Sequence, residues 1–402
     1  MSRFTRAVLV AAACSALAAC GSSSSPGPAA PSAASSPSQS GRPATASPGP
    51  GSQQPYRGFG VTSLSFVTPR QGFALGSAAC GSTRCAVLLG TSDGGRTWRR
   101  LTAPTQSLGQ PYSTCPDRRP CVGDLAFATA TTGYAYSPAL MITTDGGRHW
   151  RLLDRTGVAS LTIAGDTVTR VDSGYFGCSG RPYKVQSAPV GSTTWRDLAA
   201  PAIVMICPPV LYRQSSQIVL AGYGNPAGGV RATARIDRSS DGGRAWAAGP
   251  DQCGGHDGYA SAVAIAAPST VVLLCQHQMA KPDGTYGPAW IRVSADNGAT
   301  FGPGRPVPDA VASQKGEVTS YRLAAGSSGR LLVLEGLNQD WRLLRTANGG
   351  RSWTTALHPD AFGDAFVTGF TGGQTAWVGQ ANSLWTTHDG GVTWHASHFV
   401  SG

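Results

Sequence analysis

The 402-residue chain is poor in charged residues and very poor in glutamate. Charged side chains make up 13% of the sequence, and Glu317 and Glu335 are its only glutamates. Hydrolysis by two carboxylates needs an acid and a base or nucleophile about 5–9 Å apart. No pattern pairs the carboxylates of the predicted loops, which are Asp117, Asp257, Asp283, Asp309 and Glu317. The composition therefore argues against this kind of catalysis.

Motifs for other active sites are missing as well. The sequence has no Gly-x-Ser-x-Gly, no His-Glu-x-x-His, no Cys-x-x-Cys and no Gly-rich phosphate loop with its Lys. His395 and His398 lie near His388, but their spacing places them on opposite faces of a strand. Helical periodicity is missing throughout. We therefore expect an all-β fold with no cofactor and no metal site.

A short repeat, in contrast, occurs six times. It combines a hydroxyl residue, Asp or Asn, Gly and an aromatic residue at fixed offsets. The copies are TSDGGRTW (91–98), TTDGGRHW (143–150), SSDGGRAW (239–246), SADNGATF (294–301), TANGGRSW (346–353) and THDGGVTW (387–394). A repeat of this kind determines the architecture of the whole chain.

The chemistry of one copy predicts a tight turn. Asp or Asn before Gly favours a turn, since its side-chain oxygen accepts backbone N–H bonds and Gly tolerates positive φ. The flanking apolar runs are short and β-branched, so the turn should join two antiparallel strands. We interpret the acidic position as a turn-builder, not a catalyst or calcium ligand: Asp93, Asp145, Asp241, Asp296, Asn348 and Asp389. The closing aromatic should anchor each repeat on its neighbour: Trp98, Trp150, Trp246, Phe301, Trp353 and Trp394.

The repeat resembles the Asp-box, or BNR, repeat of sialidases, sortilin-type receptors and the photosystem II assembly-factor family. The segments SLSFVTPRQGFALG and DLAFATATTGYAYS are similar to the strand-one signature of the last family. The resemblance extends from about residue 58 to the end. It implies a WD40/YVTN/BNR-like β-propeller in which each box is the turn between the third and fourth strands of a blade. The motif is specific for the fold and uninformative about function.

The spacing of the boxes gives the number of blades. Neighbouring boxes lie 41 to 55 residues apart, but Asp145 and Asp241 are separated by 96 residues. A degenerate copy, SAPVGSTTW at 187–195, fills this gap, so we predict seven four-stranded antiparallel blades. Six blades are the alternative, and would leave a long unexplained loop. Two closures remain open: residues 58–67 add a strand to the last blade, or HASHF at 395–399 completes that blade alone.

The N-terminal residues predict export. Arg3 and Arg6 precede an apolar run too short to span a bilayer, and the run ends in LAACG. This ending resembles a bacterial lipobox, which makes residues 1–20 a lipoprotein signal peptide and Cys20 the lipid attachment site. Cys14 and an ordinary secretory signal are the weaker alternatives. Residues 21–57, rich in Ser, Pro, Ala and Gly, form a disordered linker, and residues 58–402 form the propeller. We expect a monomer anchored on the outer face of the cytoplasmic membrane.

Eight cysteines remain in the propeller, an even number suited to an oxidising compartment. The blade map places them in loops opposite the boxes. Sequential pairing gives Cys80–Cys85, Cys115–Cys121, Cys178–Cys207 and Cys253–Cys275, all on one face.

We expect that stapled face to carry recognition, because rigid scaffolds present function on their loops. Aromatic and basic residues in its loops suit a protein or glycan partner. The candidates are Tyr112, Arg118, Arg119, Tyr175, Arg181, Tyr183, His256, Asp257, Tyr259, His277, Tyr286 and Arg305. On the other face, Arg96, Arg148, Arg244 and Arg351 recur at one box position, as solvated turn residues. The formal charge of +11 is spread along the chain, and an exported protein rarely meets nucleic acid, which we exclude as a partner.

The main alternative is a sialidase-like or other glycoside hydrolase of cell-surface glycans. The resemblance to sialidases implies an Arg triad, a Tyr nucleophile activated by Glu and an acid Asp. The Arg-Ile-Pro motif of that family is missing, because the region before the first box reads SFVTPRQGFALG. We therefore predict a membrane-anchored, non-catalytic binding scaffold.

Overall fold

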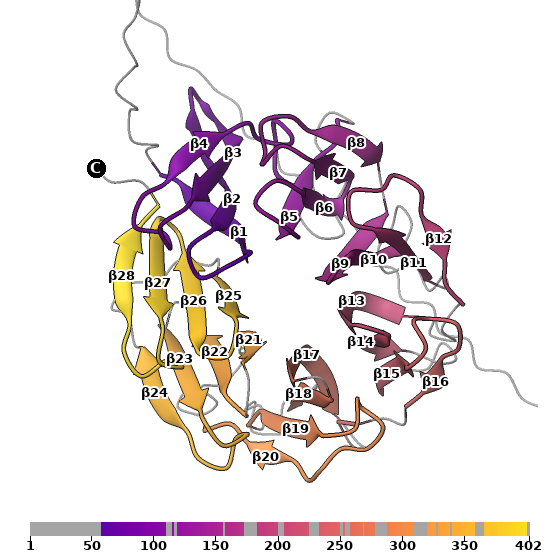
Figure 1. Ribbon diagram of the computed structural model, residues 1–402. Helices are drawn as coiled ribbons and strands as arrows, with labels where there is room; N and C mark the ends of the chain where they lie inside the picture. Colours follow the sequence, from indigo (N-terminus) through magenta and orange to yellow (C-terminus); the bar gives the residue numbers. More distant parts are fainter. Residues whose placement is uncertain are drawn as a thin grey trace, which may run out of the picture. The chain divides into compact units, whose positions relative to one another are not determined.

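Seven β-sheets, arranged in a ring, make up the folded part of the chain (Figure 1). The structure, a computed structural model, describes residues 58–109, 115, 119–155, 157–172, 183–199, 205–224, 233–249, 252–253, 258–267, 269–277, 288–308, 320–326, 329–337, 340–357 and 366–399. Cys20 and the predicted signal peptide and linker lie outside these residues. In the described ranges no helix is long and apolar enough to cross a membrane.

Each sheet is a blade of four antiparallel strands that follow one another in the chain. Blade 1 has β1 (Gly60–Phe66), β2 (Gly72–Cys80), β3 (Thr83–Thr91) and β4 (Arg99–Leu101). Blade 2 has β5 (Val122–Phe127), β6 (Gly133–Pro138), β7 (Leu140–Thr143) and β8 (Arg151–Asp154). Blade 3 has β9 (Val158–Ala164), β10 (Thr167–Asp172), β11 (Lys184–Pro189) and β12 (Arg196–Asp197).

The remaining four blades repeat this order. Blade 4 has β13 (Met205–Gln214), β14 (Gln217–Gly224), β15 (Thr233–Ser239) and β16 (Ala247–Ala248). Blade 5 has β17 (Gly258–Ala267), β18 (Thr270–His277), β19 (Trp290–Ser294) and β20 (Arg305–Pro306). Blade 6 has β21 (Ser320–Ala325), β22 (Leu331–Leu337), β23 (Asp340–Thr346) and β24 (Thr354–Leu357). Blade 7 has β25 (Phe366–Thr371), β26 (Thr375–Gln380), β27 (Ser383–Thr387) and β28 (His395–His398). The prediction of a seven-bladed propeller is confirmed.

Each box is the turn between the third and fourth strands of its blade, as the first box shows. The Thr91 hydroxyl donates to Asp93 Oδ1 (2.8 Å) and accepts from the Gly95 N–H (2.9 Å). Asp93 Oδ1 also accepts the N–H groups of Arg96 and Thr97, both at 3.0 Å. The hydroxyl and the carboxylate together satisfy the backbone donors of the turn, which is why both residue types recur.

The box turns and the turns between first and second strands lie at the same end of the blades. In six blades, the backbone N–H of the residue after the box Asp or Asn donates to a carbonyl of the turn between the first and second strands. In blade 1, the Gly94 N–H donates to the Arg70 carbonyl at 2.9 Å. We call this surface the box face. The opposite surface, with the β2–β3-type hairpins and the connections between blades, is the loop face.

The third blade keeps its turn without an acidic residue. Its backbone bond to the first turn is retained, because the Val190 N–H donates to the Asp166 carbonyl at 2.7 Å. The Gly191 N–H donates to the Tyr134 hydroxyl of blade 2 at 2.9 Å. A side chain of the preceding blade therefore supplies an acceptor for this turn, and the segment at 187–195 is the hidden repeat.

Seven apolar clusters form the core, one between each pair of neighbouring blades. Each contains the aromatic residue of one box, partly buried against the preceding blade: Trp98, Trp150, Trp195, Trp246, Phe301, Trp353 and Trp394. The second box Gly also contacts the preceding blade. A Cβ at Gly95 (φ 88°) would lie 2.4 Å from Leu384, so only Gly fits there.

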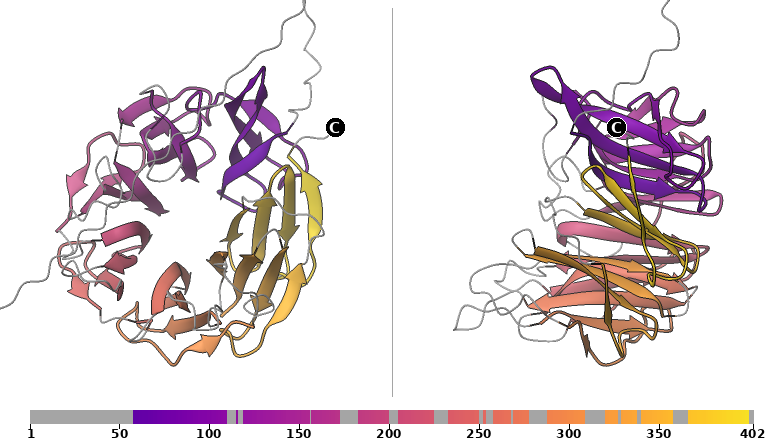
Figure 2. Two further views of the ribbon diagram at one scale, coloured as in Figure 1. Left: turned by 180° about the vertical axis from the view of Figure 1, so that it is seen from behind. Right: turned by 90° about the vertical axis from the view of Figure 1, so that its left-hand side faces the viewer.

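The ring closes without a shared strand. Blade 7 is completed by its own β28, and β1 is the inner strand of blade 1 (Figures 1 and 2). An aromatic cluster joins the two blades: the Phe399 ring lies 5.3 Å from Phe59 and 5.1 Å from Trp98. The Ser397 hydroxyl donates to the Gly95 carbonyl at 3.0 Å. Of the two closures left open by the sequence, the last blade completes itself.

Candidate functional site

Three disulfides cross-link the loop face, and each joins cysteines that are consecutive in the sequence, as predicted. Cys80–Cys85 closes the hairpin between β2 and β3. Cys115–Cys121 lies in the connection from blade 1 to blade 2. Cys253–Cys275 ties the connection into blade 5 to β18. The predicted Cys178–Cys207 pair lies outside the described residues and side chains.

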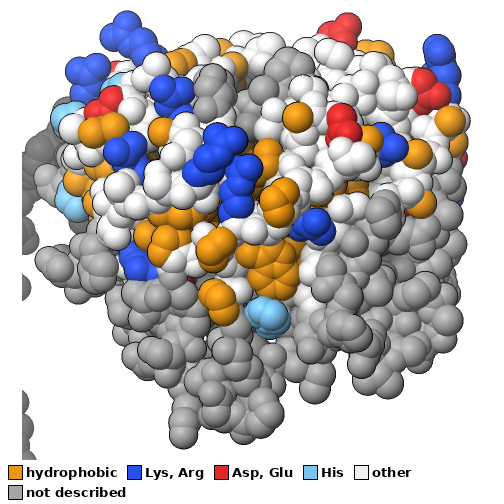
Figure 3. Space-filling model, turned by 90° about the horizontal axis from the view of Figure 1, so that it is seen from below, with side chains coloured by type: hydrophobic (Ala, Val, Ile, Leu, Met, Phe, Trp, Pro, Cys, Tyr) orange, Lys and Arg blue, Asp and Glu red, His pale blue; other side chains and the backbone are white. Residues whose placement is uncertain are grey.

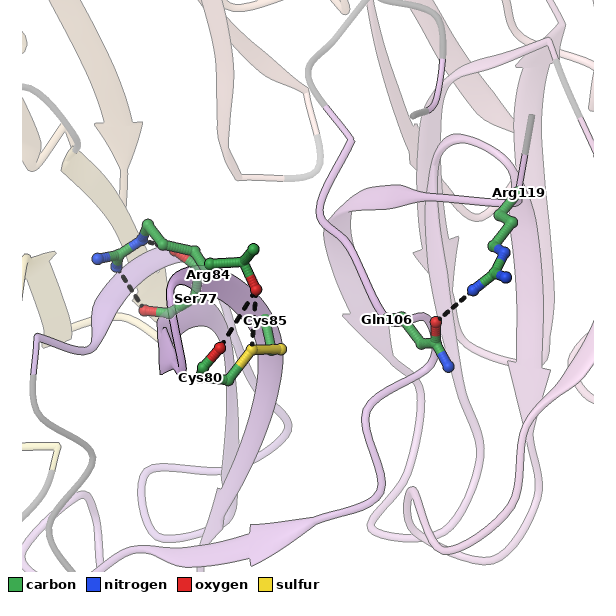
Figure 4. Close-up of a disulfide and its surroundings, with 7 residues drawn as sticks. Ser77, Cys80, Arg84, Cys85, Gln106 and Arg119 are labelled. Atoms are coloured by element: carbon green, nitrogen blue, oxygen red, sulfur yellow. Dashed lines mark hydrogen bonds between the residues drawn. A yellow bond between two sulfur atoms is a disulfide. The ribbon is translucent and has the colours of Figure 1, made fainter. Parts of the chain in front are cut away.

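Arg84 extends the first staple to the start of the propeller. Its Nε donates to the Ser77 hydroxyl (2.9 Å) and its Nη2 to the Ser77 carbonyl (2.8 Å; Figure 4). Its Nη2 also donates to the carbonyl of Gly58 at 2.8 Å. The backbone N–H of Ala86 in the same hairpin donates to the carbonyl of Gln106 at 3.0 Å. The hairpin therefore holds both the first strand and the connection to blade 2.

A hollow of about 240 Å³ lies where that connection crosses the outer strands of blade 2. We call it the connector hollow. It is lined by Pro104, Thr105, Gln106, Ser107, Arg119, Pro120, Met141 and Leu152. Arg119 Nη1 donates to Gln106 Oε1 at 2.8 Å, which holds the guanidinium at the rim (Figure 4). The adjoining Cys115–Cys121 bridge fixes the segment that carries Arg119. The site thus combines an apolar floor with one exposed cation and several hydrogen-bonding groups.

His277 marks a second part of the loop face. It ends β18, two residues after Cys275, and its ring centroid lies 4.8 Å from that of Trp290. His277 is partly buried, so the pair presents only part of an aromatic surface.

Two of the candidate recognition residues are not on the loop face. Tyr183 is 2% exposed and packs with Val185 and Leu220 between blades 3 and 4, where burial raises its pKa to about 12. The side chain of Arg305 runs towards the box face, since its Nη1 donates to the carbonyl of Gly349 in the sixth box turn (2.5 Å). Both predictions are wrong, because Tyr183 precedes β11, Arg305 lies in β20, and each side chain contacts the neighbouring blade.

The other predicted recognition residues differ in whether the structure describes their side chains. Arg119 and His277 are on the loop face and reachable. Tyr259 lies in β17, with a side chain outside the description. Tyr112, Arg118, Tyr175, Arg181, His256, Asp257 and Tyr286 lie outside the described residues. Gln106 and the floor of the connector hollow were missed, because no residue in that floor differs in type from ordinary core.

The box arginines are solvated, as predicted. Arg96, Arg148, Arg244 and Arg351 are all exposed. On the side of the molecule shown in Figure 3, basic side chains are interspersed with apolar ones. Within the described residues, no group of three His, Cys, Asp or Glu side chains could hold a metal ion.

Two acidic side chains of the sheets, Glu335 and the partly buried Asp124, are not exposed on either face. Glu335 is fully buried, and Arg342 Nε donates to its Oε2 at 2.8 Å, so it belongs to an internal ion pair. Asp124 lies opposite Tyr136 in the β5–β6 pairing, and burial raises its pKa to about 6. Burial also raises the pKa of Tyr136, with a further contribution from the charge of Asp124.

Comparison with known proteins supports the fold alone. No protein-family model matches the chain, and no curated protein matches it by sequence. Among solved structures, it is similar to the GH74 xyloglucanase of Xanthomonas campestris, with 14% identity and a TM-score of 0.55. That match covers 87% of this chain and 55% of the xyloglucanase, so the chain spans about half of that protein.

Two further structures are similar over nearly their whole length. The β-propeller domain of the Trilobed protease of Pyrococcus furiosus, which has an open velcro topology, shares 9% identity and a TM-score of 0.53. The match covers 86% of this chain and 97% of that domain. YCF48 bound to a D1 peptide has 15% identity and a TM-score of 0.49, over 83% of this chain and 94% of that one.

Proposed function

We propose that this protein is an exported binding scaffold that recognises a partner in the cell envelope through its loop face. The observation that carries the proposal is the connector hollow, in which Arg119 and Gln106 stand over an apolar floor beside a disulfide. Loops fixed by bridges lose less entropy on binding, which favours recognition. All three described bridges serve this face.

The chemistry of the hollow favours a protein partner over a glycan. Met141, Leu152 and two prolines form the floor, which suits an apolar side chain. Arg119 has further donors beyond its bond to Gln106 and suits a carboxylate or carbonyl of the same partner. An apolar anchor next to an arginine is typical of the residues that dominate protein interfaces.

The setting of the scaffold is part of the proposal. The repeats resemble Asp-boxes, the disulfides suit an oxidising compartment, and the LAACG segment would place a lipid on Cys20. Two acyl chains suffice for stable anchoring. The protein would then work as a monomer on the outer face of the cytoplasmic membrane, with residues 21–57 as its tether.

Binding to isolated envelopes tests this function. Purified full-length protein is mixed with washed native envelopes, and the bound fraction is measured by sedimentation over a range of concentrations. Arg119→Ala should weaken binding by about ten- to a hundred-fold, the effect of losing a hydrogen bond to a charged group. Arg351→Ala, an equally exposed arginine on the box face, is the matched control and should leave binding unchanged. Equal effects of the two changes would refute recognition by the loop face.

Catalysis is tested in parallel on fluorogenic glycosides, including sialosides. We place the scaffold ahead of a glycoside hydrolase because Glu335 is sealed in an ion pair with Arg342. Clear turnover that is lost in Asp124→Asn or Glu317→Gln would overturn the binding proposal.

A further inference from the structure

The boxes of blades 4 and 5 both depart from the repeat where the two blades meet. A cavity of about 320 Å³ opens there on the box face. It is lined by Gln217, Arg238, Ser239, Ser240, Asp241, Ala245, Trp246, Ala247, Asp296 and Asn297. These residues belong to the box of blade 4 (239–246), the box of blade 5 (294–301) and the strands of blade 4, so we call the cavity the box-face hollow. Each box carries the number of its blade.

The fourth box lacks one side chain that the other acidic boxes have. Elsewhere the residue four positions after the Asp donates to its Oδ2: Thr97 to Asp93 and Thr393 to Asp389, both at 2.6 Å. In the fourth box this position is Ala245, so Asp241 Oδ2 accepts no hydrogen bond from the described residues. Asp241 Oδ1, in contrast, keeps its usual donors, led by the N–H groups of Arg244 and Ala245. One carboxylate oxygen is therefore available at the edge of the hollow.

The fifth box departs from the repeat on the other side of the hollow. Ala299 stands where four boxes have Arg, and Phe301 stands where the others have Trp. Asn297 replaces the first Gly and adopts a left-handed conformation with φ 58°. These changes remove one long side chain, replace an indole by a smaller ring and add one amide, and Asn297 lines the hollow.

The packing of the two blades is correspondingly looser at this end. In four of the other boxes a Cβ on the second Gly would collide with the preceding blade, for example 2.5 Å from Leu198 at Gly243 and 2.3 Å from Ile291 at Gly350. At Gly298 of the fifth box, the nearest atoms belong to Phe301 and Val271 of its own blade, at 3.8 Å. The box turn of blade 5 thus stands back from blade 4, and the hollow occupies the space between them.

The charges in the hollow select the kind of ligand. Arg238 Nε is buried and finds no acceptor among the described residues, so it offers a hydrogen-bond donor. The two carboxylates of Asp241 and Asp296 outnumber the guanidinium of Arg238, so the lining repels an anion. A neutral, hydroxyl-rich ligand can donate to Asp241 Oδ2 and accept from Arg238 and Asn297. The volume lies at the lower end of small-molecule pockets, roughly 300–1,000 Å³, and suits a single ring.

We infer that the box-face hollow binds one neutral sugar residue. This site is separate from the loop face and does not depend on the function proposed for it. Sugar binding here uses the departures of boxes 4 and 5 from the repeat, so restoring the repeat should abolish it.

Two variants that restore the repeat test this prediction. Ala245→Thr supplies the hydroxyl that would occupy Asp241 Oδ2, and Ala299→Arg supplies the missing box arginine. Both restore residues that other boxes of this chain carry, so both variants should fold. Val392→Arg makes the Arg restoration in the seventh box, where Val392 is 56% exposed, and is the matched control.

Binding is measured by saturation-transfer NMR and titration of the full-length protein with three neutral probes at millimolar concentration. The probes are methyl β-D-glucopyranoside, methyl α-D-mannopyranoside and N-acetylglucosamine, with glucuronate and glucosamine as the charged comparisons. At least one neutral probe should bind the native protein, and Ala245→Thr and Ala299→Arg should each weaken it at least ten-fold. Val392→Arg should change nothing, and the anionic glucuronate should bind more weakly than the neutral probes. Failure of all three neutral probes, or affinities that the two box variants leave unchanged, would overturn the inference.

Discussion

Replacement of Phe399 by Ala should open the ring at the junction of the first and last blades. Phe399 is 1% exposed and contacts Phe59 and Trp98 at centroid distances of 5.3 and 5.1 Å. Truncation of a buried Phe to Ala costs about 3–5 kcal/mol, through lost burial and the cavity left behind. Because no strand is shared between these blades, the closure depends on side-chain packing around Phe399 and on a few hydrogen bonds.

The assay must separate opening from general destabilisation. Phe73→Ala is the matched control, since Phe73 is equally buried but lies between blades 1 and 2, which the chain itself connects. Both variants should lose about 3–5 kcal/mol of unfolding free energy in denaturant titrations. Hydrogen exchange should accelerate in β1 and β28 of Phe399→Ala at native conditions, and stay slow there in Phe73→Ala. Equal protection of β28 in the two variants would refute closure by this cluster.

Three further predictions concern charge and cross-links. Burial opposes ionisation of Asp93, but hydrogen bonds from Thr97, Thr91 and the backbone lower its pKa from 3.8 to about 2. The ionised carboxylate therefore stabilises the folded state above about pH 4, and this stability should be lost as the pH falls towards 2. Asp93→Asn, which copies the natural Asn348, should flatten this part of the stability curve in denaturation measured from pH 6 to 2. Asp124 has a raised pKa of about 6, so its ionisation disfavours the folded state as the pH rises from about 4 to 6. Asp124→Asn should therefore raise the unfolding free energy by about 2 kcal/mol at pH 7 and by little at pH 4. The partial exposure of Asp124 to solvent keeps this gain below the value for a fully buried group. Loss of Cys253–Cys275, which spans 22 residues, should cost about 3 kcal/mol, and loss of Cys80–Cys85, which spans 5, about 2 kcal/mol, in paired Cys→Ala variants; a larger effect of the shorter bridge would contradict the loop-entropy reasoning.

The fold was predictable because its determinants are local and repeated. Each box carries its own hydrogen-bonding partners, as Thr91 and Asp93 do, so the turn can be identified without knowledge of any distant residue. The spacing of boxes then counts the blades. Even the degenerate third copy was identified from its position and from Gly191 and Trp195. The mode of closure was not predictable, since it depends on whether β1 or β28 pairs with β27, a competition between distant segments.

The candidate site was predictable only in part. Three of the four predicted bridges are present in the described residues, because cysteines close in sequence on one face can meet; the Cys178–Cys207 bridge stays a prediction. The exposure of individual side chains could not be predicted from the sequence, since contacts with the adjacent blade, and not their own loops, position Tyr183 and Arg305. The box-face hollow has a sequence signal, Ala245 and Ala299 in place of conserved positions of the repeat within this chain. That signal has meaning only once blades 4 and 5 are known to be neighbours.

The central claim is that recognition occurs on the stapled loop face. Hydrogen exchange of the full-length protein, free and bound to native envelopes, tests it most directly. The account predicts slower exchange on binding at residues 80–86, 104–109 and 119–122, with the box turns at 91–98 and 346–353 unchanged. Protection confined to the box turns, or spread evenly over both faces, would contradict it.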